Sequence, residues 1–179
     1  MSDEQTPTVL HQGRHLRMLR RDGWEYVERV GARGIVVLVA LTAEDRLLLV
    51  EQVRPPLGAP VIELPAGLAG DAAGSEDESL ESAARRELLE ETGYRAEALQ
   101  RLTSGPISAG LSTEVIDVFL ARPVARVADG GGDASEDIRV HAVPLSEAHE
   151  WLAARGAAGG LVDTKVYSGL YFAERALGG

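Results

Sequence analysis

The chain has 179 residues, which is enough to bury one domain core and short for two. Its net charge of −10 disfavours a nucleic-acid or anionic-membrane surface, since both need clustered Lys and Arg, so we expect neither nucleic acid nor a membrane as a partner. Because it contains no cysteine, disulfides, thiolate metal sites and cysteine nucleophiles are excluded as well.

The N-terminal part predicts a β-hairpin after a loose, polar start over residues 1–12. These residues show no targeting pattern, and no run approaches eighteen apolar residues, so we expect a cytoplasmic location. Residues 14–30 are typical of two strands joined at Asp22 and Gly23, a dipeptide that favours a tight hairpin turn. The β-branched run 34–41 then predicts a strand buried on both faces.

The middle of the chain predicts two further strands, a loop and a helix. Strands are expected over 46–53 and 60–67, and a glycine- and acid-rich surface loop follows the second strand. A helix is expected over 80–92. Its ends carry the usual capping residues, which are Asp77 or Ser79 at the N-terminus and Gly93 at the C-terminus.

The last third predicts a strand pair, one more strand and two helices. The strand pair covers 97–105 and 114–124, and the third strand covers 138–145. The glycine-rich segment 128–137 is a candidate mobile lid. The helices are expected from Ser146 to about residue 155, with Gly156 as the stop, and over 163–176. Strands with three interspersed helices indicate an α/β layered domain.

The helix over 80–92 carries glutamates on its apolar side. Each residue advances by about 100° around a helix, so Glu87 and Glu91 fall at about −20° and 20° from Leu80, within the apolar stripe. Carboxylates on such a face lose hydration and repel one another, so they need a compensating cation. Arg86 can compensate one of them. The others, together with Glu90, indicate a metal that prefers oxygen ligands, such as Mg²⁺.

This segment resembles the Nudix box, whose pattern is G-x5-E-x7-R-E-U-x-E-E-x-G-U, where U is a bulky apolar residue. The fixed positions are matched by Glu78, Arg86, Glu87, Leu88, Glu90, Glu91, Gly93 and Tyr94. The leading glycine departs from the pattern, because Ala72 stands at its position. Gly67 is the natural counterpart, which implies five extra residues in the loop before Glu78.

Further segments are similar to the ADP-ribose and ADP-sugar pyrophosphatase branch of the Nudix hydrolases: VEQVRPP, IELPAG, SAGLSTE and SEDIRVHAVPLSEAHEWL. The resemblance implies that Mg²⁺, with Mn²⁺ as a substitute, is bound by Glu87, Glu90, Glu91 and the main-chain carbonyl of Ala66. It also implies that Arg86 orients the carboxylates together with Glu78.

The same resemblance implies a substrate site. The residues at the matching positions are Trp24, Glu25, Arg29 and Arg54 for the adenine and phosphates, and Glu114 for the terminal ribose. A loop glutamate would act as general base. Glu136 is the nearest match, and Asp133 is the second because the loop alignment can slip by a few residues. Taken alone, Trp24 on a hairpin is more typical of a core or an interface than of base stacking.

The resemblance implies an αβα sandwich with a mixed β-sheet, preceded by an N-terminal β-hairpin. The expected division is residues 1–32 as dimer-forming strands and residues 33–179 as the Nudix domain. The expected activity is Mg²⁺-dependent cleavage of ADP-ribose or a related ADP-sugar to AMP and a sugar phosphate, by a homodimer acting on a small nucleotide.

Two alternatives stay open. The branch typically has a proline sixteen residues after the box glycine, where this chain has Ala109. That departure favours another nucleoside diphosphate derivative, such as GDP-mannose or a dinucleoside polyphosphate. The third hypothesis is a non-catalytic nucleotide-binding regulator, against which the intact glutamates of the box count.

Overall fold

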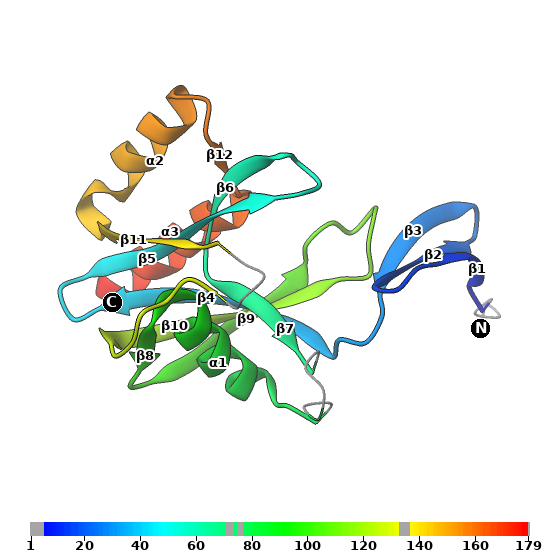
Figure 1. Ribbon diagram of the computed structural model, residues 1–179, viewed down its shortest axis with the longest axis horizontal. Coiled ribbons are helices and arrows are strands. Elements are labelled where there is room, and N and C mark those ends of the chain that lie inside the picture. The colour runs from blue at the N-terminus through cyan, green and yellow to red at the C-terminus, as the bar shows by residue number, and fades with distance from the viewer. Residues whose placement is uncertain (1–5, 71–73, 75–76, 133–136, 179) are drawn as a thin grey trace.

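The computed structural model of the chain describes residues 6–70, 74, 77–132 and 137–178. Within these residues, a three-stranded sheet stands apart from a nine-stranded sheet that has helices on both faces (Figure 1). No helix in this described part is long and apolar enough to cross a membrane.

The N-terminal sheet consists of three consecutive antiparallel strands: β1 (Thr8–Gln12), β2 (Leu16–Arg21) and β3 (Trp24–Arg29). The predicted hairpin turn is confirmed, since Asp22 and Gly23 join β2 to β3 with φ angles of 50° and 82°. The prediction of a loose start was wrong for β1. All of its residues are exposed, so the strand carries no burial pattern that a sequence could show.

The larger sheet is mixed. Its strands are β4 (Gly34–Thr42), β5 (Arg46–Arg54), β6 (Ala59–Glu63), β7 (Ala66–Ala69), β8 (Tyr94–Ala96), β9 (Leu99–Pro106), β10 (Val115–Arg126), β11 (Arg139–Pro144) and β12 (Leu161–Val162). The main path runs β12-β6-β5-β4-β10-β8, while β11 pairs with β5, β7 with β4 and β9 with β10. β10 and β4 are parallel, as are β12 and β6.

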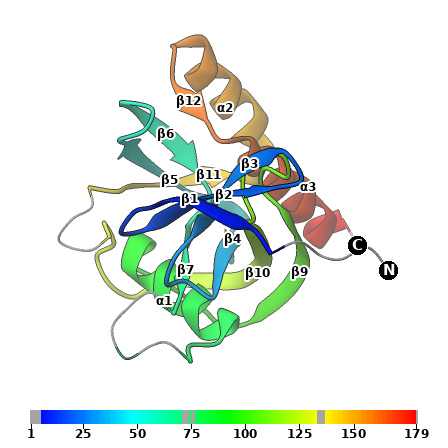
Figure 2. The same ribbon diagram turned by 90° about the vertical axis from the view of Figure 1, so that its right-hand side faces the viewer.

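Helices cover both faces of this sheet, with α1 (Leu80–Thr92) on one face and α2 (Ala148–Ala157) and α3 (Thr164–Gly178) on the other (Figure 2). The central strand β4 shows why. Alternate residues such as Val36 and Leu38 pack with Leu88 of α1, whereas Val37 packs with Val166 of α3. The predicted αβα sandwich and the strand buried on both faces are therefore confirmed.

The predicted start of the helix from Ser146 needs correction. Ser146 was expected to cap a helix, but it lies inside a short 3₁₀ helix (Leu145–Glu147), and neither this turn nor α2 has a side-chain cap. The buried side chain of Leu145 and the hydrogen bond from its amide to the Asp45 carbonyl, at 3.0 Å, tie this turn to the sheet instead. The expected stop at Gly156 was also wrong, because α2 continues to Ala157.

Candidate active site

Helix α1 presents the acidic face, and its two ends are formed as predicted. Ser79 is the N-cap, because its Oγ accepts a hydrogen bond from the Ser82 amide at 3.1 Å. Gly93 ends the helix in the left-handed region with a φ of 76°. The caps set the ends of the helix, and the packing of Ala83, Ala84 and Leu88 against the sheet sets which side chains face it.

The three glutamates of α1 are buried in the order that the helical phase predicts. Glu91 is 3% exposed, the Glu87 side chain is 12% exposed and the Glu90 side chain is 48% exposed. Strand β7 lies against the two buried acids. The Ala66 amide donates to Glu91 Oε2 at 3.0 Å, and a Cβ added to Gly67 would lie only 1.9 Å from Glu87 Cδ. Glycine at position 67 therefore leaves the room that Glu87 occupies.

Arg86 links these carboxylates. Its Nη1 donates to Glu87 Oε1 at 2.8 Å and to Glu90 Oε2 at 3.0 Å. Its Nε and Nη2 donate to the two carboxylate oxygens of Glu78, each at 3.0 Å, and Nη2 also donates to the Leu68 carbonyl at 2.9 Å. The hydrogen bonds from Arg86 lower the pKa of Glu78 despite the opposing effect of burial, and the pKa of Arg86 is raised in return. Both groups therefore stay ionised at neutral pH.

A cavity of about 430 Å³, which we call the glutamate cavity, opens between α1, β7 and other strands of the sheet. Most of the residues predicted for the site line it: Ala66, Arg86, Glu87, Glu90, Glu91, Arg29, Arg54 and Glu114. Its other basic side chains are paired with acids: Arg29 with Glu114 at 2.8 Å, Arg54 with Glu63 at 2.6 Å and Lys165 with Asp163.

The charges around this cavity fit a divalent cation. Among the described residues, its lining contains five glutamates and four basic side chains, an excess of one negative charge. A diphosphate would add further negative charge, and a divalent cation would offset it. Carboxylate oxygens suit Mg²⁺, which keeps several of its waters and needs few protein ligands.

The carboxylates are not yet gathered as metal ligands. Within the described ranges, no three His, Asp or Glu side chains converge closely enough to hold an ion. The reason is that Glu87 and Glu90 bond to Arg86, while Glu91 bonds to the Ala66 amide. The donor set fits the predicted metal, provided that the cation shares Glu87 and Glu90 with Arg86.

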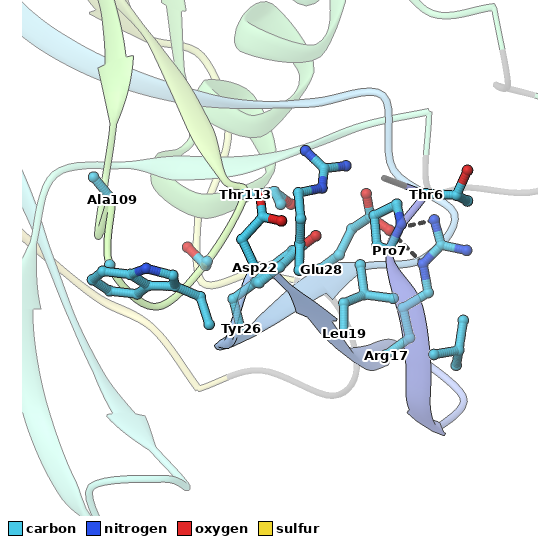
Figure 3. Close-up of a pocket in the computed structure, with 14 residues that line it drawn as sticks. Thr6, Pro7, Arg17, Leu19, Asp22, Tyr26, Glu28, Ala109 and Thr113 are labelled. Atoms are coloured by element: carbon cyan, nitrogen blue, oxygen red, sulfur yellow. Dashed lines mark hydrogen bonds and ion pairs between the residues drawn. The ribbon is translucent and has the colours of Figure 1, made fainter. Parts of the chain in front are cut away.

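Some predicted residues lie away from this cavity. Trp24 is 65% exposed and lines a second cavity of about 660 Å³, which we call the Trp24 cavity. It lies between the N-terminal sheet and the loop before β10. Ala109 stands on the rim of that cavity, and Tyr26 lies in it (Figure 3). Glu25 is exposed and lines neither cavity. Glu136 and its alternative Asp133 lie outside the described residues.

Two charged residues that line the glutamate cavity were not predicted as site residues. Glu63, at the end of β6, is buried and holds Arg54. Lys165, in the first turn of α3, closes the cavity from the other face of the sheet. Lys165 could have been singled out, because it is the only lysine in the sequence. Glu63 had no such signal beyond its place in the IELPAG segment.

Comparison with known proteins places these observations in a family. The family model described as NUDIX domain matches residues 32–161. The ADP-sugar pyrophosphatase of Mus musculus is 34% identical over 164 residues, which cover 81% of this chain and 71% of that protein.

Other relatives match over shorter stretches. The ADP-ribose pyrophosphatase of Bacillus subtilis (strain 168) is 35% identical over 116 residues, 64% of this chain and 60% of that protein. The chain thus spans less than two thirds of that relative's length. A GDP-mannose pyrophosphatase of Yersinia enterocolitica is 34% identical over 123 residues, 64% of this chain and 61% of that protein.

A solved structure shares the fold over nearly the whole chain. It is described as a crystal structure of ADP compounds hydrolase, and it covers 99% of this chain and 97% of its own, with a TM-score of 0.66 and 19% sequence identity. At that identity the likeness supports the fold alone.

Proposed function

The chain belongs to the Nudix family, and on that premise we propose that it is a Mg²⁺-dependent hydrolase of ADP-ribose or a related ADP-sugar, giving AMP and a sugar phosphate. The observation that carries the proposal is the cavity that brings three glutamates of α1 together with Arg29 and Arg54. Cleaving a diphosphate requires charge neutralisation at several oxygens and a water positioned for attack, and this set of side chains supports both.

Glu87, Glu90, Glu91 and the carbonyl of Ala66 would hold the Mg²⁺, with Mn²⁺ as a substitute. When bound, the cation supplies neutralisation of phosphate charge and a more acidic water. Arg86 keeps Glu87 and Glu90 on the same wall of the cavity through its hydrogen bonds of 2.8 and 3.0 Å.

The remaining cations of the cavity serve the phosphates. Arg29 and Arg54 are only partly buried, and each is already aligned by a glutamate, Glu114 or Glu63. A guanidinium presents several donors in a fixed plane, so it can contact a phosphate while it keeps a bond to its glutamate. In this arrangement Glu114 also faces the substrate.

The general base is proposed to come from the loop over 128–137, as Glu136 or Asp133. The described start of this loop supports the assignment. The amides of Gly131 and Gly132 donate to the carbonyls of Glu91 and Glu90, at 2.9 and 3.1 Å. The start of the loop therefore lies against the last turn of α1, beside the backbone of two proposed metal ligands.

A homodimer is part of the proposal. Trp24 and Glu25 are assigned to the adenine, yet neither lines the glutamate cavity of its own chain. A second copy could bring its N-terminal sheet to that cavity, since the sheet stands apart from the main body (Figure 1). The homodimer, the adenine contacts and the cytoplasmic location stay predictions.

A substrate panel tests the proposed function. Hydrolysis of ADP-ribose is compared with that of GDP-mannose, a diadenosine polyphosphate and NADH, in Mg²⁺ and in EDTA. We expect ADP-ribose to be cleaved fastest and EDTA to abolish the reaction. No turnover of any of the four in Mg²⁺ would contradict the enzyme assignment.

GDP-mannose is the second candidate substrate. Ala109 replaces the proline typical of the ADP-ribose branch, and one of the matched relatives is a GDP-mannose pyrophosphatase. Ala109 lines the Trp24 cavity and not the glutamate cavity, so it bears on which nucleoside is bound and not on the cleavage step. Faster cleavage of GDP-mannose than of ADP-ribose would favour this candidate.

A further inference from the structure

Lys165 lies at an unusual place for the only lysine of the chain. It stands in the first turn of α3, its side chain is 21% exposed, and its ammonium pairs with Asp163. The Asp163 carboxylate also accepts a hydrogen bond from the Lys165 amide at 2.8 Å. Asp163 therefore holds both the start of the helix and the Lys165 side chain. The result is a positive charge held on the wall of the glutamate cavity, opposite in sign to the acids of α1.

A third cavity, of about 280 Å³, lies between β9 and α3, and we refer to it as the β9–α3 cleft. It shares Val37, Ile116 and Lys165 with the glutamate cavity. The two spaces are therefore neighbours, and Lys165 stands at their junction.

The lining of the β9–α3 cleft is apolar below and polar at the rim. Val118 and Leu64 are buried at its base, while the hydroxyls of Ser104 and Ser168 lie at exposed positions. Within the described sheet, β9 pairs only with β10, so its other edge offers backbone donors and acceptors. A sugar ring has apolar C–H faces and a polar hydroxyl edge, which match this lining. A nucleobase fits less well, since no carboxylate or carboxamide side chain of the described lining is available to bind its edge.

We propose that the β9–α3 cleft binds the terminal sugar of the substrate and that Lys165 contacts the phosphate attached to that sugar. This inference rests on the proposed hydrolysis of a nucleoside diphosphate sugar. It assigns the two halves of the substrate to different places, because the nucleotide half would stay with the arginines of the glutamate cavity. It therefore departs from the contact between Glu114 and the terminal ribose that the resemblance implies, since Glu114 lines the glutamate cavity and not the cleft.

Inhibition by the two reaction products tests this assignment. ADP-ribose hydrolysis is measured with AMP and with ribose 5-phosphate as inhibitors, for the wild type, Lys165→Met and Lys165→Arg. We expect Lys165→Met to raise the KM for ADP-ribose and the inhibition constant of ribose 5-phosphate on the order of tenfold or more, as for loss of a charge-assisted hydrogen bond. The inhibition constant of AMP should stay within about twofold, and Lys165→Arg should recover most of the affinity.

A variant of the cleft itself separates the sugar contact from the phosphate contact. Ser168→Phe adds bulk at an exposed position of α3. We expect it to weaken inhibition by ribose 5-phosphate and to leave inhibition by AMP unchanged. Thermal unfolding of all three variants checks that each one is folded. Equal weakening of AMP and ribose 5-phosphate, or no change in either, would overturn the assignment.

The single lysine also allows a measurement that does not depend on turnover. Protein labelled with ¹⁵N-lysine gives NMR signals from Lys165 alone. We expect ribose 5-phosphate to shift these signals and AMP to leave them in place. If the wild type cleaves no ADP-ribose, the proposed function fails, but the titration still decides on the cleft. If turnover is present and ribose 5-phosphate causes no shift, the cleft assignment alone is overturned.

Discussion

Arg86 sets the geometry of the acidic wall at the scale of single residues. One guanidinium contacts Glu78, Glu87 and Glu90 and a carbonyl of β7, all within 3.0 Å. Glu78 is the counterion that lies farthest from the cavity, so it fixes Arg86 without occupying the space for a substrate. Replacing either member of this pair would change the orientation of the proposed metal ligands as well as the stability of the fold.

Glu90→Gln should remove most of the activity and leave the protein folded. The side chain is about half exposed, so its charge contributes little to stability, but it is a proposed ligand of the cation. We expect kcat for the best substrate to fall on the order of a hundredfold or more. Glu81→Gln is the matched control, since Glu81 lies on the same helix and pairs with Arg85 at 3.1 Å. Full activity in Glu90→Gln would contradict the proposed site.

Glu78→Gln should lower the free energy of unfolding by about 2 kcal/mol at neutral pH, because a charge-assisted hydrogen bond is lost. The pKa of Glu78 is lowered from its ordinary value of 4.5, so its contribution is present above that value. The contribution is lost as the pH falls through the lowered pKa of the folded state. Urea unfolding of wild type and variant at pH 7 and in acid should thus show a difference that shrinks on acidification. A difference that stays constant would exclude the carboxylate pair as its cause.

The helical period predicted the burial of Glu87 and Glu91, because their positions relative to the apolar stripe depend only on spacing within one helix. It could not predict Lys165, which reaches the cavity from the opposite face of the sheet. Nor could it show that Trp24 lines a different cavity from the glutamates. Those placements depend on how distant segments pack, and local spacing carries no information about them.

At the scale of elements, the loop over 128–132 is fitted closely to the end of α1. A Cβ added to Gly130 would lie 2.3 Å from the Thr92 carbonyl carbon, and one added to Gly93 would lie 2.3 Å from the Ala128 oxygen. The sequence predicted a glycine-rich loop here but not its contact with the helix, because that contact joins segments nearly forty residues apart. Strand β7 was not predicted as a separate strand, because its first two residues fell within the strand expected over 60–67 and its bounds are defined by its pairing with β4.

Gly130→Ala should destabilise the protein and slow turnover. The added methyl meets backbone atoms that cannot rotate away, so the loop must move from α1, at a cost of about 2 kcal/mol. Gly156→Ala is the control, because nothing lies within 4 Å of a Cβ at that position of α2. Chemical unfolding and kcat are measured for both. Equal stability of the two variants would show that the loop tolerates the displacement.

At the scale of the molecule, the N-terminal sheet is the part with least support from its own chain. Its contacts with the main body include hydrogen bonds from the Val27 amide to the Leu111 carbonyl at 2.9 Å and from the Thr113 amide to the Val27 carbonyl at 3.1 Å. On the face that lines the Trp24 cavity, Val9 is 51% and Trp24 is 65% exposed, whereas Leu19, the cross-strand partner of Val9, is buried. Exposed apolar side chains on one face are typical of an interface.

Val9→Glu should convert the proposed homodimer into a monomer and raise the KM for substrate. A buried, unpaired carboxylate is unfavourable in an apolar interface. Met18→Glu is the control, because Met18 is adjacent to Leu19 on β2 and faces the opposite side of the sheet. Sedimentation equilibrium gives the mass of each variant. A wild type that sediments as a monomer would contradict the dimer, whatever the variants do.

The bonds from the loop to α1 have a consequence for hydrogen exchange. The amides of Gly131 and Gly132 are bonded to carbonyls at the last turn of the helix, so they can exchange with deuterium only when that turn opens. Their protection should therefore report how often the proposed metal ligands lose their alignment in the absence of any nucleotide. Added Mg²⁺ should slow exchange at both glycines, and the rest of the chain serves as an internal reference.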